Sequence, residues 1–280
     1  IKSQMINNKN TNNTKVTHNT QVTHNTQVTN NTQVTNNSII PKLGLIGNPI
    51  SHSKSPALFA AAYSSYPFTY NLIEANTIQK AMERFFGEGF TGANVTAPFK
   101  DLVFKYINHT YRISSLLKIA NIIIRKGEEL HSYNSDYYGV KNTIEELIAN
   151  GHPITKALVI GAGGAGKAAT LALNDLGIKT FWANRTPLSY PAYIHLSQIP
   201  QYATECQLII YTLAFKIKEM EEINLKNKII FEANYANPQF ANAESYISGK
   251  HWLYNQAIPA FKLFTGIEPN TNEMKKTIGF

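Results

Sequence analysis

The chain has 280 residues and a formal net charge of +8, with 26 basic and 18 acidic side chains. This length is enough for about two domains of typical size. No apolar stretch reaches the roughly 18 residues that a membrane-spanning helix needs, which excludes a membrane protein. The basic residues are scattered rather than gathered into the dense stripe of a nucleic-acid binder. We therefore expect a small anionic ligand, with neither a membrane nor a nucleic acid as partner.

Two features predict a cytoplasmic protein. The N-terminal residues lack the apolar segment of a signal peptide. Cys206 is the only cysteine, so no internal disulfide can form, which is typical of a reducing compartment.

Residues 1–38 are poor in apolar side chains and repetitive. Four consecutive hexads of the form Asn-Thr-Gln-Val-Thr-His or Asn-Thr-Gln-Val-Thr-Asn run from Asn13 to Asn36, with Lys15 in place of the first glutamine. Short periods of this kind occur in β-helices, but each turn here would bury a single valine. We predict a low-complexity, disordered tail over residues 1–38 and assign it no chemistry.

Residues 39–137 alternate between strand-like and helix-like segments. Ser55 and Pro56 are predicted at the N-cap and the first position of a helix. Alternation of this kind predicts an α/β domain with a mainly parallel sheet. The predicted strands are 43–46, 70–75 and 92–96, and the predicted helices are 57–63 and 78–86.

The second half of the chain repeats the alternation. A helix is predicted over 136–150, and Gly151-His152-Pro153 ends it as a candidate connector. Its apolar face is predicted to carry Val140, Ile144, Leu147 and Ile148. A βαβ unit follows, and then two further strands and a C-terminal helix. These elements are predicted at 157–160, 164–176, 179–183, 208–211, 229–232 and 255–264.

We therefore predict a two-domain α/β protein with a cleft between the domains. Residues 39–137 form the substrate-binding domain, which helices in 253–280 join. Residues 138–252 form a Rossmann-type nucleotide-binding domain.

The turn after the predicted strand 157–160 carries a dinucleotide-binding signature. Gly161 is expected to make the tight turn, Gly163 to let the backbone approach a pyrophosphate, and Gly166 to let the helix pack on the sheet. The helix N-terminus would add free amides and a positive dipole. A merely tight structural turn is the alternative that the glycines leave open. The segment reads Gly161-Ala162-Gly163-Gly164-Ala165-Gly166.

The end of the predicted strand 179–183 bears on the choice of cofactor. An acidic residue there would bind the ribose of NAD, but the chain has Asn184-Arg185-Thr186. A guanidinium and two neutral polar groups suit a 2′-phosphate, so the predicted cofactor is NADP(H). The alternative is that Arg185 is an ordinary exposed arginine.

Four polar residues in the first half suggest a substrate site. Ser53 and Ser55 would face the same way in extended backbone and could bind one carboxylate together. Lys100 and Asp136 lie where two predicted strands end. The alternatives are that Ser55 only caps a helix and that the two charges are solvated.

In combination with the glycine turn, three segments resemble the shikimate dehydrogenase family, over about residues 40–280. They are Ser53-Lys54-Ser55-Pro56, the Asn-Val-Thr-Ala-Pro-Phe-Lys run at 94–100, and Asn134-Ser135-Asp136. The resemblance implies reversible, NADPH-dependent reduction of 3-dehydroshikimate to shikimate on the route to chorismate and the aromatic amino acids. It also implies a monomer or a homodimer, and no metal.

The resemblance also assigns roles to single residues. Lys100 is implied as the general acid and base, with Asp136 as its partner. The implied substrate-binding residues are Ser53, Ser55, Thr96, Asn121, Tyr235 and Gln256.

The chain departs from the family pattern at three places. The small residues that usually flank the asparagine are replaced in the segment 118–122, and the usual Pro-x-Gly loop near the nicotinamide reads Thr-Leu-Ala-Phe-Lys at 212–216. Glu232 replaces an aspartate. A quinate or quinate/shikimate dehydrogenase and a catalytically silent ligand sensor remain alternatives. A folate-type dehydrogenase would have no use for the Ser53 and Ser55 pair.

Overall fold

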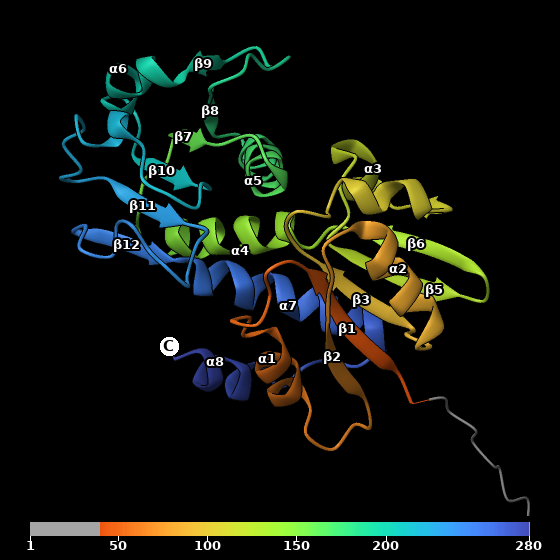
Figure 1. The fold of residues 1–280 in the computed structure, drawn as a ribbon. Helices are drawn as coiled ribbons and strands as arrows, with labels where there is room; N and C mark the ends of the chain where they lie inside the picture. The colour runs from red at the N-terminus through yellow and green to blue at the C-terminus, as the bar shows by residue number, and fades with distance from the viewer. Residues whose placement is uncertain (1–39, 280) are drawn as a thin grey trace, which may run out of the picture. The chain divides into compact units, whose positions relative to one another are not determined.

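The computed structural model describes residues 40–279, so the predicted tail over residues 1–38 lies outside the described residues. The described chain forms two six-stranded sheets with helices packed against them (Figure 1). Within residues 40–279, no helix is long and apolar enough to cross a membrane.

The first sheet has the strand order β2-β1-β3-β5-β6-β4. Three of its strand pairs are parallel, as predicted, and the hairpin of β5 and β6 adds two antiparallel pairs. The hairpin is absent from the predicted elements, although Gly127, at φ +63°, supplies the left-handed residue that such a tight turn requires. The strands are β1 (Lys42–Gly47), β2 (Thr69–Glu74), β3 (Gly92–Val95), β4 (His109–Thr110), β5 (Ile122–Lys126) and β6 (Glu129–Tyr133).

Helix α1 (Ser55–Ala62) begins at Ser55, one residue earlier than the start at Pro56 that the predicted N-cap implies. Lys54 is the N-cap, so Ser55 is the first helical residue and the prediction that Ser55 caps the helix is wrong. Pro56 is tolerated at the second position because the first amides of a helix have no intrahelical acceptor. The other helices beside this sheet are α2 (Ile78–Gly87), the 3₁₀ turn η1 (Leu102–Tyr106) and α3 (Arg112–Leu117).

The second sheet has the strand order β12-β11-β10-β7-β8-β9, with every neighbouring pair parallel. The chain winds outward from β7 in both directions, so the switch between β7 and β10 is where such sheets bind ligands. The predicted βαβ unit is confirmed. Its elements and the others of this half are β7 (Lys156–Ile160), α5 (Gly164–Asp175), β8 (Lys179–Asn184), β9 (Tyr193–His195), η2 (Leu196–Gln198), α6 (Ile199–Ala203), β10 (Leu208–Tyr211), η3 (Lys218–Met220), β11 (Ile229–Glu232) and β12 (Ser245–Ser248).

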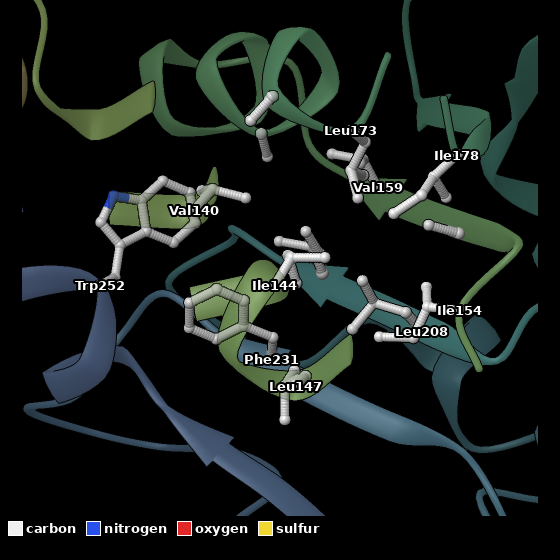
Figure 2. Packing of buried hydrophobic residues seen from close by; sticks show 14 of the residues in the cluster. Val140, Ile144, Leu147, Ile154, Val159, Leu173, Ile178, Leu208, Phe231 and Trp252 are labelled. Atoms are coloured by element: carbon white, nitrogen blue, oxygen red, sulfur yellow. The ribbon is translucent and has the colours of Figure 1, made fainter. Parts of the chain in front are cut away.

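Helices α4 (Asp136–Ala149) and α7 (Gly249–Thr265) pack along each other (Figure 1). Buried side chains of α4 and Trp252 of α7 belong to one apolar cluster with the second sheet, shown in Figure 2. Val140, Ile144 and Leu147 lie in this cluster as predicted. Ile148 does not, because it is 43% exposed at the margin of the helix face. The prediction that Ile148 shares the buried face is wrong.

The C-terminal helices pack against the first half of the chain. Helix α7 begins before the predicted residue 255, with the Ser248 side chain accepting a hydrogen bond from the Lys250 amide at its start. Both α7 and α8 (Thr271–Ile278) contact α1, and Phe59, Phe261 and Met274 share one buried cluster. These contacts support the predicted joining of 253–280 to the substrate-binding domain. The domain bounds themselves stay a prediction.

Candidate active site

A cavity of about 300 Å³ brings together side chains from both halves of the chain. The loop after β1, the end of β3, the segment 233–236 after β11, and helix α7 all contribute to its wall. We call it the serine cavity. Seven of the predicted site residues line it, namely Ser53, Ser55, Thr96, Lys100, Asn121, Tyr235 and Gln256.

The two serines reach the cavity through a turn rather than an extended segment. Lys54 between them is helical, at φ −85° and ψ −4°, so the prediction that an extended backbone aligns the serines is wrong. The Ser53 hydroxyl oxygen accepts a hydrogen bond from the Ser55 amide at 3.2 Å. The Tyr235 hydroxyl accepts one from the Lys54 amide at 3.4 Å. This turn gathers three hydroxyl groups at one end of the cavity.

Tyr70 supports the serine cavity from β2, a contribution that the sequence analysis missed. Its hydroxyl donates a hydrogen bond of 2.8 Å to Asn94 Oδ1, and Asn94 Nδ2 donates to the Asn121 carbonyl at 3.4 Å. Burial raises the pKa of Tyr70 well above its usual range, and its hydrogen bond with Ser55 offsets only part of this shift. Tyr70 is therefore a neutral donor that fixes the Asn94 amide.

Lys100 and Asp136 form a largely buried ion pair. Lys100 Nζ lies 2.5 Å from Asp136 Oδ2, and the two side chains are 18% and 4% exposed. The second oxygen of Asp136 accepts a hydrogen bond from Trp252 Nε1 at 3.2 Å. The alternative that both charges are solvated on the surface does not describe this geometry.

Asn121 is buried beside this pair and is hydrogen-bonded at both ends of its amide. Its Nδ2 atom donates to Gln256 Oε1 at 2.9 Å and to Ser135 Oγ at 3.1 Å, and its Oδ1 atom accepts from the Ser135 amide at 2.7 Å. The changed flank at 118–122 therefore leaves Asn121 firmly placed. Asn121 orients Gln256 and the residue that precedes Asp136.

A second cavity, of about 430 Å³, lies over the start of α5. We call it the glycine-turn cavity. Thr96, Ala97 and Lys100 line both this cavity and the serine cavity, so Lys100 stands at their boundary. Its other lining residues are Pro98, Asp101, Ile119, Ala162, Gly163, Gly164, Ala165, Lys167 and Thr212.

The three key glycines have the geometry that the dinucleotide-binding signature requires. Gly161 has φ +105°, and a Cβ atom there would lie 2.4 Å from Thr212 Oγ1. A Cβ atom on Gly166 would lie 2.0 Å from the Gly161 carbonyl oxygen. At Gly163 a Cβ atom would meet nothing within 4 Å, so this backbone is open to a ligand. A side chain at Gly161 or Gly166 would therefore clash with neighbouring atoms, whereas one at Gly163 would not.

The predicted phosphate-reading segment lies outside both cavities. Asn184 ends β8, and its Nδ2 atom donates to the Thr186 carbonyl at 2.9 Å. Arg185 is exposed and forms no ion pair or hydrogen bond with any other described residue. Its guanidinium is therefore available to an external anion.

Two residues that the sequence analysis did not assign complete the glycine-turn cavity. Lys167 follows the last glycine of the signature and brings a cation to the first turn of α5. Thr212 binds the end of β7 through its hydroxyl, which donates to the Ile160 carbonyl at 2.8 Å. The position of Lys167 beside the signature was a usable signal. Thr212 begins the 212–216 loop that the resemblance places near the nicotinamide, but its contact with Ile160, 52 residues away, has no local signal.

Sequence comparison identifies relatives of the chain. The family model of the shikimate dehydrogenase substrate-binding domain matches residues 45–123. A curated shikimate dehydrogenase (NADP(+)) from Archaeoglobus fulgidus is 29% identical over 265 residues, which cover 84% of this chain and 96% of that protein.

Solved structures share the fold. Shikimate dehydrogenase from Aquifex aeolicus superposes with a TM-score of 0.76 at 24% identity, covering 87% of this chain and 99% of that one. Quinate dehydrogenase from Corynebacterium glutamicum in complex with NAD gives a TM-score of 0.72 at 20% identity, covering 85% and 98%. Together with the matching substrate-binding domain and the near full-length relative, they show that the chain is similar to shikimate dehydrogenases and shares their α/β fold.

Proposed function

We propose that the chain catalyses the reversible, NADPH-dependent reduction of 3-dehydroshikimate to shikimate on the route to chorismate and the aromatic amino acids. The observation that carries the proposal is the place of Lys100, which borders both cavities and is paired with Asp136. A proton donor at this boundary suits a reaction between two bound molecules. The name of the Archaeoglobus fulgidus relative supports the same reaction and cofactor.

NADP(H) suits the residues around the glycine turn. The backbone from Ala162 to Ala165 and the start of α5 would hold the pyrophosphate, with Lys167 as a nearby cation. The free guanidinium of Arg185 would bind the 2′-phosphate, flanked by Asn184 and Thr186. When bound, the cofactor supplies the hydride that reduces the ketone.

The serine cavity would orient the substrate. The hydroxyl groups of Ser53, Ser55 and Tyr235 would hold its carboxylate at one end of the cavity. Thr96, Asn121 and Gln256 would bind the ring oxygens. Holding a small molecule at both ends fixes the carbonyl beside Lys100, which lowers the entropy cost of reaction.

Lys100 would then move the proton. In reduction, its ammonium group gives a proton to the oxygen that becomes the hydroxyl, and in oxidation the neutral amine takes that proton back. Asp136 accepts the hydrogen bond that aims Lys100, while Trp252 holds the other carboxylate oxygen. The chain thus supplies orientation and a proton at one defined atom.

The test is the formation of NADPH, followed by its absorbance, when the purified protein meets shikimate and NADP⁺. Quinate and NAD⁺ are assayed in parallel, and Lys100→Ala is the matched control. Turnover that needs shikimate, NADP⁺ and Lys100 is expected. Faster turnover of quinate or NAD⁺ would favour a quinate dehydrogenase. No turnover, despite stabilisation by shikimate or NADP⁺, would identify a ligand sensor and refute the proposal.

The proposal also covers the domain bounds, the cellular compartment and the oligomeric state. We place the substrate-binding domain at 39–137 with 253–280, and the nucleotide-binding domain at 138–252. The described thiol, Cys206, is free and buried, which supports a working place in the reducing cytoplasm. The assembly would be a monomer or a homodimer, which sedimentation would decide.

A further inference from the structure

Three metal-ligating side chains outside the active site converge at the β4 end of the first sheet. They are His109 on β4 and Glu129 and His131 on β6. One ligand atom from each residue lies within 4.8 Å of the ligand atoms of the other two. None of the three lines the serine cavity or the glycine-turn cavity.

The strand pairing explains why these side chains meet. In the parallel pair of β4 and β6, His109 lies directly opposite His131, so both imidazoles project from one face of the sheet. Glu129 precedes His131 by two residues and therefore shares that face. The two imidazole rings stack with centroids 4.6 Å apart and an interplanar angle of 28°.

The distances between the ligand atoms suit a small divalent ion. Glu129 Oε2 lies 3.0 Å from His109 Nε2 and 4.0 Å from His131 Nε2. A tetrahedral zinc site with bonds of about 2.0–2.2 Å places neighbouring ligand atoms about 3.4 Å apart. The observed separations lie on either side of this value. Small rotations of His109 and Glu129, whose side chains are 52% and 57% exposed, would close the site.

The third ligand is held more firmly. The side chain of His131 is only 12% exposed, and its Nδ1 atom lies 3.5 Å from the Tyr111 hydroxyl. The Tyr111 ring stacks on Tyr133 with centroids 4.2 Å apart. A partner on one imidazole nitrogen orients the ring and leaves the other nitrogen for a metal, as in many zinc sites.

We propose that His109, Glu129 and His131 bind one divalent ion of the Zn²⁺ class, with water at the fourth position. Two imidazole nitrogens and one carboxylate oxygen form a donor set that zinc accepts. Mg²⁺ and Ca²⁺ prefer sites made of oxygen ligands, so they should bind far more weakly. The ion would tie β4 to β6 and thereby secure the short edge strand. This site does not depend on the proposed dehydrogenase activity.

The test is a calorimetric titration of Zn²⁺ into the full-length chain at neutral pH, with Mg²⁺ as a second arm. All proteins carry His18→Asn and His24→Asn, because the later hexads have asparagine at the same position. This background removes both histidines of residues 1–38. We expect one equivalent of Zn²⁺ to bind and to raise the Tm by about 5 °C at saturation.

Two exposed ligands provide the decisive variants. His109→Gln and Glu129→Gln should each weaken Zn²⁺ binding at least about tenfold, and His152→Gln, at an exposed histidine after α4, should not. In the presence of EDTA all three should keep the Tm of the background, because exposed substitutions rarely alter stability. Absence of Zn²⁺ binding, binding unchanged in both ligand variants, or equal affinity for Mg²⁺ would overturn the proposal.

Discussion

Trp252 and Asp136 are joined by a hydrogen bond of 3.2 Å from the indole Nε1 atom to the carboxylate Oδ1 atom, across 116 residues of sequence. The other carboxylate oxygen of Asp136 faces Lys100 at 2.5 Å. Asp136 is therefore held on one side by helix α7 and holds the lysine on the other. The packing of α4 against α7 therefore helps to set the direction in which the Lys100 side chain points.

The first prediction concerns Lys100 itself. Lys100→Ala should lower kcat at least about 10²-fold with little change in KM, because the lysine acts mainly in the transition state. Steady-state kinetics with shikimate and NADP⁺ measure the effect. A kcat equal to that of the parent protein would remove Lys100 from the mechanism.

Trp252 is a positioning residue, because it acts through Asp136. Trp252→Phe keeps most of the apolar contact but loses the donor to a charged acceptor, so we expect kcat to fall about tenfold with KM nearly unchanged. Tyr137→Phe is the matched control, since it removes a hydrogen bond of 2.8 Å to Asp175 in the same helix region. An equal loss of kcat in both variants would indicate a general effect on the fold.

The glycine turn allows two substitutions with opposite outcomes. Gly166→Ala places Cβ against the Gly161 carbonyl oxygen at 2.0 Å, so we expect a loss of about 3 kcal/mol or more in the free energy of unfolding. Gly163→Ala meets open space and should keep its Tm while weakening NADPH binding. Thermal melts and NADPH titrations measure both. Unchanged NADPH affinity in Gly163→Ala would move the pyrophosphate elsewhere.

Arg185 is expected to discriminate between the two nicotinamide cofactors. Arg185→Ala should raise the Kd for NADPH at least about tenfold and leave that for NADH nearly unchanged, because a guanidinium binds a phosphate through charge-assisted hydrogen bonds. Lys179→Ala, an exposed cation at the start of β8, is the control. Equal losses for NADPH and NADH would show that Arg185 does not bind the 2′-phosphate.

Cys206 gives a prediction for alkaline pH. Burial raises the pKa of its thiol from 9.0 to about 11, so the folded protein disfavours the thiolate. The stability that the un-ionised Cys206 thiol contributes to the fold is fully present below pH 9.0. It is lost as the pH rises through about 11. Cys206→Ala should therefore flatten the decline of Tm between these values.

The same thiol should resist a disulfide reagent in the native protein, because at pH 8 roughly one thiol in a thousand is ionised. Labelling should follow unfolding instead. Rapid labelling of the native protein at pH 8 would contradict the burial of Cys206.

Much of this protein is determined by local sequence. The strands 208–211 and 229–232 coincide with β10 and β11 because short apolar runs bounded by polar residues specify a buried strand. The glycine turn is equally local, since φ +105° at Gly161 is a backbone conformation that favours glycine. Segments such as 43–46 and 157–160 also follow from patterns within a few residues.

Tertiary structure decided the features that depend on contacts between residues far apart in the sequence. The hairpin of β5 and β6 joins an otherwise parallel sheet, and its edge strand β4 has only two residues, too few for a periodic signal. Helix α1 begins at Ser55 rather than after it, because Lys54 becomes the cap while Ser53 accepts from the Ser55 amide. Local helix propensity alone does not distinguish a helix that starts at Ser55 from one that starts at Pro56.

The two sites show the same division. Lys100 and Asp136 were recognisable as residues, but their partner Trp252 comes from a helix whose packing no local pattern encodes. The spacing of His109, Glu129 and His131 along the chain is not that of a metal-binding motif, and no metal was predicted from the sequence. Strand pairing is what sets the two histidines opposite each other. Side-chain types and local backbone were determined by the sequence itself, whereas the distances between functional atoms were decided by long-range packing, because those distances depend on elements that meet only in the folded chain.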